Sequence, residues 1–390
     1  SSAASAHAAA AVVGKVDGGG GAASGAIAPL PAEVVAEVRA ELARCLTEQG
    51  VQMKTAGQRA TRLFEEAVQA FEGHSAAHFQ LGVEASEAGD ALRAKASYTT
   101  AVRLHPAYME AWNNLGVACR SLGEPEQALE AYSMALKVNQ NCKKTRENMA
   151  ICLLELGCKS LQAKEWKQAS SYLKQGLVYN SSNADLYFNL AVMYAERHKF
   201  DRARVHYELA LQFEPRHMNA HNNLGVIHRR QGNLDVAARC FEEALKIDPK
   251  MPLANKNLGA LYGSMGRMSE AISLTRVALD SNPQDAEACN NLALLYRDRC
   301  DVDLCLDYLA MCIKLEPDNP HAASNHLMSL NYQSEKSAEE VFEAHRAWGE
   351  RTEANIKPQF TTYTSSVLPP VSPSFSSSAG AGGAAGSTGR

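Results

Sequence analysis

Apolar and small residues recur along most of the chain with a period of 34 residues. A leucine–glycine slot is filled by Leu81/Gly82, Leu115/Gly116, Leu224/Gly225 and Leu258/Gly259, with Leu190/Ala191 and Leu292/Ala293 as near matches. Two alanine slots follow, filled by Ala60, Ala94, Ala128, Ala203, Ala237 and Ala271, and by Ala67, Ala101, Ala135, Ala210, Ala244 and Ala278. An aromatic slot holds Phe64, Tyr98, Tyr132, Tyr207 and Phe241. The three- and four-residue spacings within each unit predict two amphipathic helices.

The units begin at residues 75, 109, 143, 184, 218, 252 and 286, after a degenerate unit near residue 41. Gly123, Gly232 and Gly266 are expected in the turn within a unit, where positive φ is easiest for glycine. Prolines that end the second helix recur at Pro106, Pro215, Pro249, Pro283 and Pro317. This is the tetratricopeptide pattern, in which each repeat packs only on its neighbours. We predict an all-α, right-handed tetratricopeptide (TPR) superhelical solenoid of about eight repeats over residues 32–319, with disordered termini.

One interval breaks the period, because 41 residues separate the unit starts at 143 and 184. The second-helix slots return late, at Ala169, Leu173 and Gly176. The seven extra residues therefore predict an extended turn near residues 158–164. A longer first helix or loop is tolerated in a solenoid because it projects outward. The other interpretation is a kink or a partner site at this point.

Both ends of the chain differ in composition from the array. Residues 1–31 are rich in Ala, Gly and Ser, and residues 357–390 are rich in Ser, Pro, Gly and Ala, so we expect both segments to be disordered. A transit peptide is the alternative for the first segment, but it would contain several arginines and this segment has none. Because the first residue is Ser1, we expect an incomplete or processed N-terminus.

Charge and cysteine usage exclude several classes of partner. A formal charge of −4 gives no reason to expect nucleic acid or anionic lipid, and no apolar run approaches the roughly 20 residues that span a bilayer. The ten cysteines form no CxxC pair and no cluster with zinc-ligand spacing, so no metal site is expected. Single thiols, including Cys300, Cys305 and Cys312, are expected to pack as small apolar residues in a reducing compartment, nucleus or cytoplasm.

One polar residue type recurs in register with the repeat, directly before the leucine slot. Its seven members are Asn114, Asn148, Asn189, Asn223, Asn257, Asn291 and Asn325. Asparagine disfavours a helix by about half a kcal/mol relative to alanine, so seven of them need a reason. An amide offers a donor and an acceptor together, which match one peptide unit of an extended chain. We expect these residues to line the concave side and bind extended protein segments.

An alternative interpretation is that each asparagine bonds the backbone of a neighbouring repeat and only sets the superhelix. The doubled asparagines Asn113, Asn222 and Asn290 give weaker support for a groove role. A carboxylate clamp would need Lys and Arg at successive groove positions, which are largely amides here. No convergent catalytic constellation is present, so no catalytic residue is expected.

The segment after the last repeat carries a more specific resemblance. Residues 319–354 read NPHAASNHLMSLNYQSEKSAEEVFEAHRAWGERTEA, and residues 147–157 read ENMAICLLELG. Together with residues 290–318, they resemble the array and linker of the protein O-glycosyltransferases of the O-GlcNAc transferase and SPINDLY type. The resemblance implies a nuclear and cytoplasmic enzyme that moves GlcNAc or fucose from UDP-GlcNAc or GDP-fucose to Ser/Thr. It also implies that residues 320–356 are capping helices and a linker towards a catalytic region.

The chain departs from that family because no donor-binding motif or candidate base comes after residue 354. We therefore expect this chain alone to transfer no sugar and to bind no cofactor. Two hypotheses remain: the substrate-recognition array of a SPINDLY-like glycosyltransferase, or a stand-alone scaffold or adaptor. A homodimer formed through the convex face is also possible, although the sequence shows no distinct surface patch that would predict it.

Overall fold

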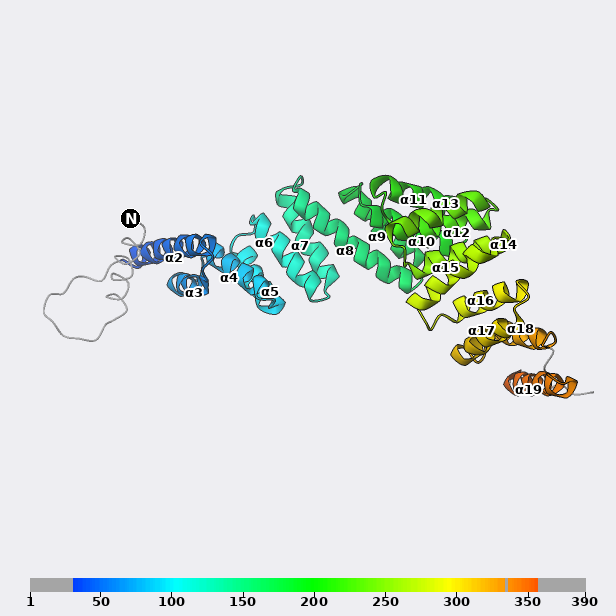
Figure 1. Cartoon of the computed structure of the whole chain (residues 1–390). Coiled ribbons are helices and arrows are strands. Elements are labelled where there is room, and N and C mark those ends of the chain that lie inside the picture. Colours follow the sequence, from blue (N-terminus) through cyan, green and yellow to red (C-terminus); the bar gives the residue numbers. More distant parts are fainter. Residues whose placement is uncertain (1–30, 334–335, 357–390) are drawn as a thin grey trace, which may run out of the picture. The chain divides into compact units, whose positions relative to one another are not determined.

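The computed structural model describes residues 31–333 and 336–356 (Figure 1). Within these ranges every regular element is a helix, from α2 to α19, which confirms the predicted all-α class. The chain divides into two compact units between Arg267 and Met268. The segments 1–30 and 357–390, for which disorder is predicted, lie outside the described residues.

Helices alternate between the first and second positions of a repeat. The first helices are α2 (Ala32–Thr55), α4 (Ser75–Glu87), α6 (Met109–Ser121), α8 (Lys143–Gln162), α10 (Ala184–Glu196), α12 (Met218–Arg230) and α14 (Pro252–Ser264), then α16 (Ala286–Asp298) and α18 (Pro320–Leu330) in the second unit. The second helices are α3 (Thr61–Ala70), α5 (Ala91–Leu104), α7 (Pro125–Val138), α9 (Trp166–Tyr179), α11 (Phe200–Phe213) and α13 (Leu234–Ile247), then α15 (Met268–Ser281) and α17 (Val302–Leu315). Within a unit, each helix packs mainly on its neighbours in sequence. The helix pairs follow the predicted repeat starts.

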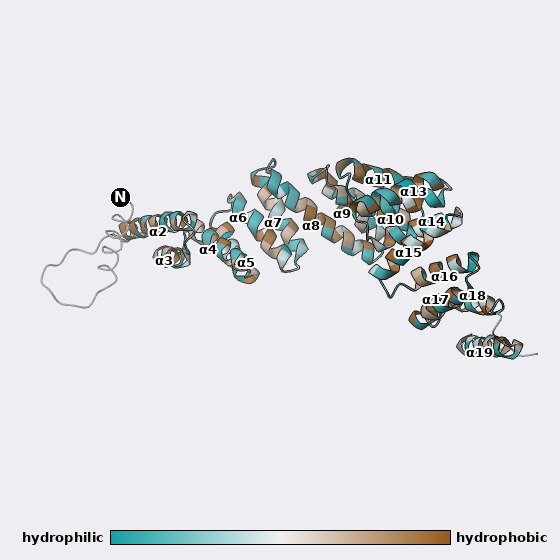
Figure 2. Ribbon diagram, in the orientation of Figure 1, coloured by the Kyte–Doolittle hydropathy of each residue, from teal (hydrophilic) through white to brown (hydrophobic). Residues whose placement is uncertain are grey.

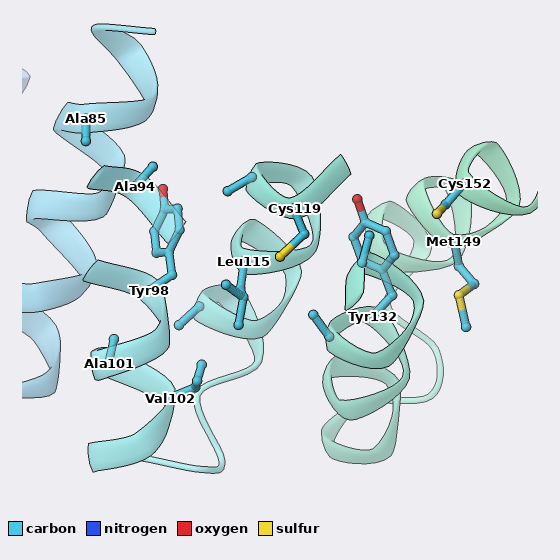
Figure 3. Close-up of a cluster of buried hydrophobic side chains, with 14 of the residues drawn as sticks. Ala85, Ala94, Tyr98, Ala101, Val102, Leu115, Cys119, Tyr132, Met149 and Cys152 are labelled. Carbon is cyan, nitrogen blue, oxygen red and sulfur yellow. The ribbon is translucent and has the colours of Figure 1, made fainter. Parts of the chain in front are cut away.

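The periodic slots form the core. Side chains in both alanine slots are at most 2% exposed, and so are the rings in the aromatic slot. Figure 3 shows Tyr98 and Tyr132 on successive second helices, with Leu115 and Cys119 on the first helix between them. Along most helices, hydrophobic and hydrophilic residues alternate in the way one buried face requires (Figure 2).

Glycine in the leucine–glycine slot makes room for a ring. A Cβ on Gly116 would lie 2.5 Å from Cε1 of Tyr132, and one on Gly225 would lie 2.7 Å from Cε1 of Phe241. The sequence predicts a close approach of helix backbones at this slot. The neighbour that fills the space is the aromatic side chain of the second helix in the same repeat.

The seven extra residues lengthen a helix rather than a turn. Helix α8 has 20 residues whereas α6 has 13, and residues 158–162 are helical. The extended turn predicted near residues 158–164 is therefore wrong, and the longer first helix is the alternative that the structure shows. Seven residues make almost two turns of 3.6, so the buried stripe keeps its direction. Gly157 accordingly lies under Leu173, the residue of α9 in the aromatic slot.

The turn within a repeat needs a left-handed residue. The predicted glycines Gly123, Gly232 and Gly266 have φ of 75° to 81°, and Gly57 and Gly89 share this conformation. In three repeats another residue adopts it: Lys164 (φ 58°), His198 (φ 55°) and Cys300 (φ 64°). A side chain in this region costs roughly 1 kcal/mol, so these three turns are strained.

In the second unit, α18 is followed by α19 (Ala338–Ile356). Leu306, Leu327 and Leu330 form a cluster against which Val341 and Trp348 of α19 pack. Both helices lie within residues 320–356, where the sequence predicts capping helices. None of the helices among residues 31–333 and 336–356 has the length and apolarity that crossing a membrane requires.

The thiols of the second unit are divided between core and surface. Cys305 and Cys312 are fully buried in repeat slots, whereas Cys300 is exposed in a turn. Core packing, which the sequence predicts for all three, is confirmed for Cys305 and Cys312 and is wrong for Cys300.

The close approach of ring and glycine predicts that Gly116→Ala lowers the free energy of unfolding by about 1–3 kcal/mol, because the added methyl group overpacks against Tyr132. Urea denaturation followed by circular dichroism measures this change. Gly349→Ala is the matched control, since it lies within α19 with no atom near its Cβ, and it should stabilise its helix. Equal effects of the two substitutions would contradict this account of the slot.

Lys164→Gly should raise the free energy of unfolding by about 1 kcal/mol, because it relieves the left-handed backbone. Lys174→Gly, at an exposed position within α9, should lower it by a similar amount, since glycine weakens a helix interior. Denaturation of both variants under the same conditions tests the opposite signs. Destabilisation by both variants would show that the Lys164 turn is unstrained.

Candidate peptide-binding face

All seven predicted asparagines lie on first helices, one on each of α6, α8, α10, α12, α14, α16 and α18. We call these residues rungs, and the surface that carries them in each unit the rung face of that unit. Each rung is half-buried, so part of its amide reaches the surface while part contacts the protein. Their hydrogen bonds show what the buried part does.

Asn114 and Asn148 are connected through a second asparagine. Asn113 donates its Nδ2–H to Oδ1 of Asn114 at 3.1 Å and accepts at its own Oδ1 from Nδ2 of Asn148 at 3.0 Å. The amide of Asn114 also lies near the hydroxyl of Tyr98 on the preceding second helix, and this hydroxyl hydrogen-bonds Oγ of Ser86 at 3.3 Å. Two neighbouring rungs thus belong to one network, which lies beside a core tyrosine.

The same network recurs 109 residues later. Asn222 donates to Oδ1 of Asn223 at 3.1 Å and accepts from Nδ2 of Asn257 at 3.0 Å. Asn223 donates from its Nδ2 to the hydroxyl of Tyr207 at 3.2 Å. In the second unit, Asn325 donates to Oδ1 of Asn290 at 3.0 Å. We call Asn113, Asn222 and Asn290 the bridging asparagines.

Asn189 has different partners. Its Nδ2 donates to the backbone carbonyl of Asp185 in its own helix at 2.8 Å, and its Oδ1 accepts from the thiol of Cys158 at 3.4 Å. Each bridging bond spans 35 residues, and the residue 35 before Asn189 is Leu154, whose side chain can make no such bond. Asn189 is therefore a rung without a bridge.

The rungs keep hydrogen-bonding capacity for a ligand. An asparagine amide has two N–H donors and two lone pairs on its oxygen. Asn223 uses one donor on Tyr207 and one lone pair on Asn222. One donor and one acceptor remain, which is what the N–H and C=O of a peptide unit require.

Sequence reasoning placed the rungs but missed their partners. The two interpretations of the asparagine pattern were groove contact and repeat-to-repeat bonding, and the bonding partners are side chains rather than backbone. The missed residues are Tyr98 and Tyr207, each 16 residues before a rung that belongs to a doubled asparagine. The rungs 16 residues after Tyr132 and Phe241 are Asn148 and Asn257, which are not doubled, and each donates to a bridging asparagine instead. A doubled asparagine 16 residues after a tyrosine is the signal that could have found these residues.

Hollows border two of the rungs. One of about 410 Å³ lies beside Asn223, with walls that include Val192, Phe200 and Ile227. Arg230 stands at this hollow with its guanidinium 5.6 Å from the centroid of the Phe200 ring. A smaller hollow of about 210 Å³ includes Asn114 and Phe79. The rung face therefore offers side-chain space as well as amides.

One group of potential metal ligands lies nearby, and its hydrogen bonds explain it. Asp185, Glu214 and His217 have ligand atoms within 4.8 Å of one another. Nδ1 of His217 accepts from the backbone N–H of Ala220 at the start of α12, so the neutral ring carries its proton on Nε2, 3.4 Å from Oδ1 of Asp185. A metal would need that nitrogen without its proton. The arrangement fits a helix cap.

Burial of Tyr207 makes the network sensitive to high pH. Burial raises the pKa of its hydroxyl from 10.0 to about 12, against the smaller lowering effect of the bond from Asn223. Because the pKa is higher in the folded chain, the neutral hydroxyl contributes fully to the free energy of unfolding below pH 10. This contribution is lost between pH 10 and about 12, where the tyrosine ionises in the unfolded chain but not in the folded one.

Between pH 10 and 12 the free energy of unfolding should therefore fall less in Tyr207→Phe than in the original chain, by on the order of 2 kcal/mol. Urea midpoints measured across this window check the difference between the variant and the original chain. At pH 7 the variant should be slightly less stable, because Nδ2 of Asn223 loses an acceptor. An unchanged alkaline slope would contradict the assignment to Tyr207.

Comparisons with known proteins agree with this architecture. Family profiles described as tetratricopeptide repeat match residues 110–142, 182–250 and 228–288. Among curated proteins, a probable UDP-N-acetylglucosamine–peptide N-acetylglucosaminyltransferase SPINDLY from Solanum lycopersicum is 38% identical over 57 residues, 15% of this chain and 6% of that protein. The protein of the same description from Oryza sativa subsp. japonica is 37% identical over 52 residues, 13% of this chain and 6% of that protein.

Among solved structures, YrrB, described as a TPR protein with an unusual peptide-binding site, aligns with 50% of this chain and 97% of its own at 20% identity and a TM-score of 0.41. The alignments with the curated relatives span about 6% of their length. Residues 110–142 and 182–288 of this chain are tetratricopeptide repeats, and its fold is an all-α tetratricopeptide solenoid.

Proposed function

We propose that the rung face binds extended segments of other proteins. One observation carries this proposal: half-buried amides recur at one repeat position and keep a donor and an acceptor after their internal bonds are counted. An extended chain presents an N–H and a C=O from each residue, so such amides bind main chain with little regard to sequence. The hollow beside Asn223 would then receive a side chain of the bound segment.

We also propose that this array recognises substrates for a SPINDLY-like protein O-glycosyltransferase. Support comes from the aligned segments of the tomato and rice proteins and from the linker motif at residues 319–354. In that case UDP-GlcNAc or GDP-fucose would be used by a catalytic region outside this chain, in the nucleus and cytoplasm. This chain would supply the binding role alone.

A stand-alone scaffold or adaptor is the second candidate, because the similarity to SPINDLY proteins covers 15% of this chain. The two candidates share the rung face and differ in whether a catalytic region is joined to the array. Sequencing the full-length transcript separates them. A reading frame that continues into a glycosyltransferase region supports the first, and a stop codon soon after residue 390 supports the second.

The binding proposal predicts that substitution of rungs by alanine weakens peptide binding. Each of Asn114→Ala, Asn148→Ala, Asn223→Ala and Asn257→Ala should lower affinity about fivefold, the equivalent of one hydrogen bond of about 1 kcal/mol. Fluorescence anisotropy with a panel of labelled, unstructured 15-residue peptides rich in Ser and Thr measures this loss. Circular dichroism checks that each variant keeps its helices.

Asn141→Ala is the control, because Asn141 is exposed in the turn before α8 and lines neither of the two hollows beside the rungs. It should leave peptide affinity unchanged. Folded rung variants that bind every peptide as well as the original chain does would refute the rung face as the binding site.

A further inference from the structure

We infer that Asn113 and Asn222 are positioning residues that join neighbouring rungs into two-rung clamps. A bound segment is then held by its main chain two repeats at a time, rather than by a uniform row of seven amides. This inference rests on the proposed peptide-binding function. To the proposed binding function it adds two points. Some of the residues needed for binding do not touch the ligand, and the rung face is divided into separate sites.

Burial shows that two of the bridging asparagines, Asn113 and Asn222, act within the protein. Asn113 is 4% exposed and Asn222 is 3% exposed, so neither offers much surface to a ligand. Both use a donor and an acceptor on side chains of two different first helices. A leucine in the same place would pack as well but could make neither bond.

The bridge fixes which way each rung amide faces. A free asparagine amide can rotate and exchange its oxygen and nitrogen. Asn222 donates to Asn223, which holds the Asn223 oxygen towards the bridge, and accepts from Asn257, which holds the Asn257 nitrogen towards it. The groups left for a ligand are therefore fixed on both rungs before binding, which lowers the entropy that binding loses.

The pattern of bridges divides the rung face. Asn114 and Asn148 form one clamp, and Asn223 and Asn257 form a second. In the other unit, Asn325 donates to Asn290, the half-buried residue before Asn291, which supplies one of the two bonds that a clamp needs. Asn189, whose donor serves its own helix, stands alone after the lengthened α8.

The partner that fits a clamp is an extended segment with free main-chain N–H groups. Proline lacks this donor, so it should be disfavoured at the residues that a clamp contacts. A clamp therefore selects segments whose main-chain N–H groups are free, and it accepts many different side chains.

Asn222→Ala tests the bridge, and Asn255→Ala is its matched control. Asn255 is 2% exposed on α14, and its amide serves the backbone carbonyls of Pro249 and Met251 instead of a rung. Both variants are made in the full chain labelled with ¹⁵N. The side-chain amide resonances of Asn223 and Asn257 are followed, with those of Asn114 and Asn148 as an undisturbed internal reference.

We expect Asn222→Ala to shift the amide resonances of both rungs, and Asn255→Ala to shift neither. Affinity for the tightest Ser/Thr-rich peptide of the panel should fall at least as far in Asn222→Ala as in Asn223→Ala, while Asn255→Ala leaves it unchanged. A peptide with proline at the contacted residues should bind more weakly than its alanine counterpart. Together these results would establish the clamp.

Each contrary result has a distinct meaning. Unshifted rung amides in Asn222→Ala would overturn the bridge, whether or not the face binds peptide. Shifted amides with unchanged affinity, while Asn223→Ala weakens binding, would overturn the positioning role alone. If neither rung substitution weakens binding, the proposed function fails and the clamp fails with it.

Discussion

The contact between a second-helix ring and a first-helix glycine sets the spacing on which the other features depend. Tyr98, Tyr132 and Phe241 lie where a Cβ on the facing glycine would come within 2.7 Å of a ring carbon. Since the ring fills all the space at this point, the hairpin can close to one separation only. The same separation in successive repeats brings Asn148 within bonding distance of Asn113, and Asn257 within bonding distance of Asn222. The amide network is thus a consequence of core packing.

The lengthened helix α8 shows how strict this constraint is. Its insertion has the length of about two helical turns, so Gly157 still lies under Leu173 while Asn148 still reaches Asn113. In a first helix of ordinary length, the residues that make the two contacts lie two positions apart, as Asn114 and Gly116 do. In α8 they lie nine positions apart, or about 13.5 Å along the axis at about 1.5 Å for each residue. The next rung, Asn189, pairs with Cys158 from the added region instead of with an asparagine. The insertion therefore preserves the core but interrupts the sequence of bridges.

Much of the fold could be predicted from the repeat. Helices that pack in the same way in each repeat need buried residues at the same repeat positions. The period located the helix pairs, the glycine turns and the prolines after second helices. It misplaced the insertion, since a count of residues alone does not separate a longer helix from a longer turn. The heptad length of the insertion was the available clue. For the rungs, the repeat period predicted that Asn114 and Asn223 occupy the same position on their helices. It could not predict their hydrogen-bond partners, because these depend on how neighbouring helices are placed. The sequence contains the hydroxyl groups of Tyr98 and Tyr207, but it does not show that they lie beside rungs. That requires the positions of the neighbouring helices.

Groove contact and repeat-to-repeat bonding are compatible roles because one amide has enough hydrogen-bonding groups for both. In Asn223, one donor and one acceptor serve Tyr207 and Asn222, and the other pair is left at a half-buried position. The helix penalty of about half a kcal/mol for asparagine is comparable with the net gain of about 1 kcal/mol from one internal bond. The internal bonds therefore offset the penalty before any ligand arrives. A residue that made only the internal bonds could be fully buried, as Asn222 is, and one that served only a ligand would need no tyrosine behind it. The half-burial of Asn223, together with its internal partners and its unused donor and acceptor, is what a residue with both roles requires.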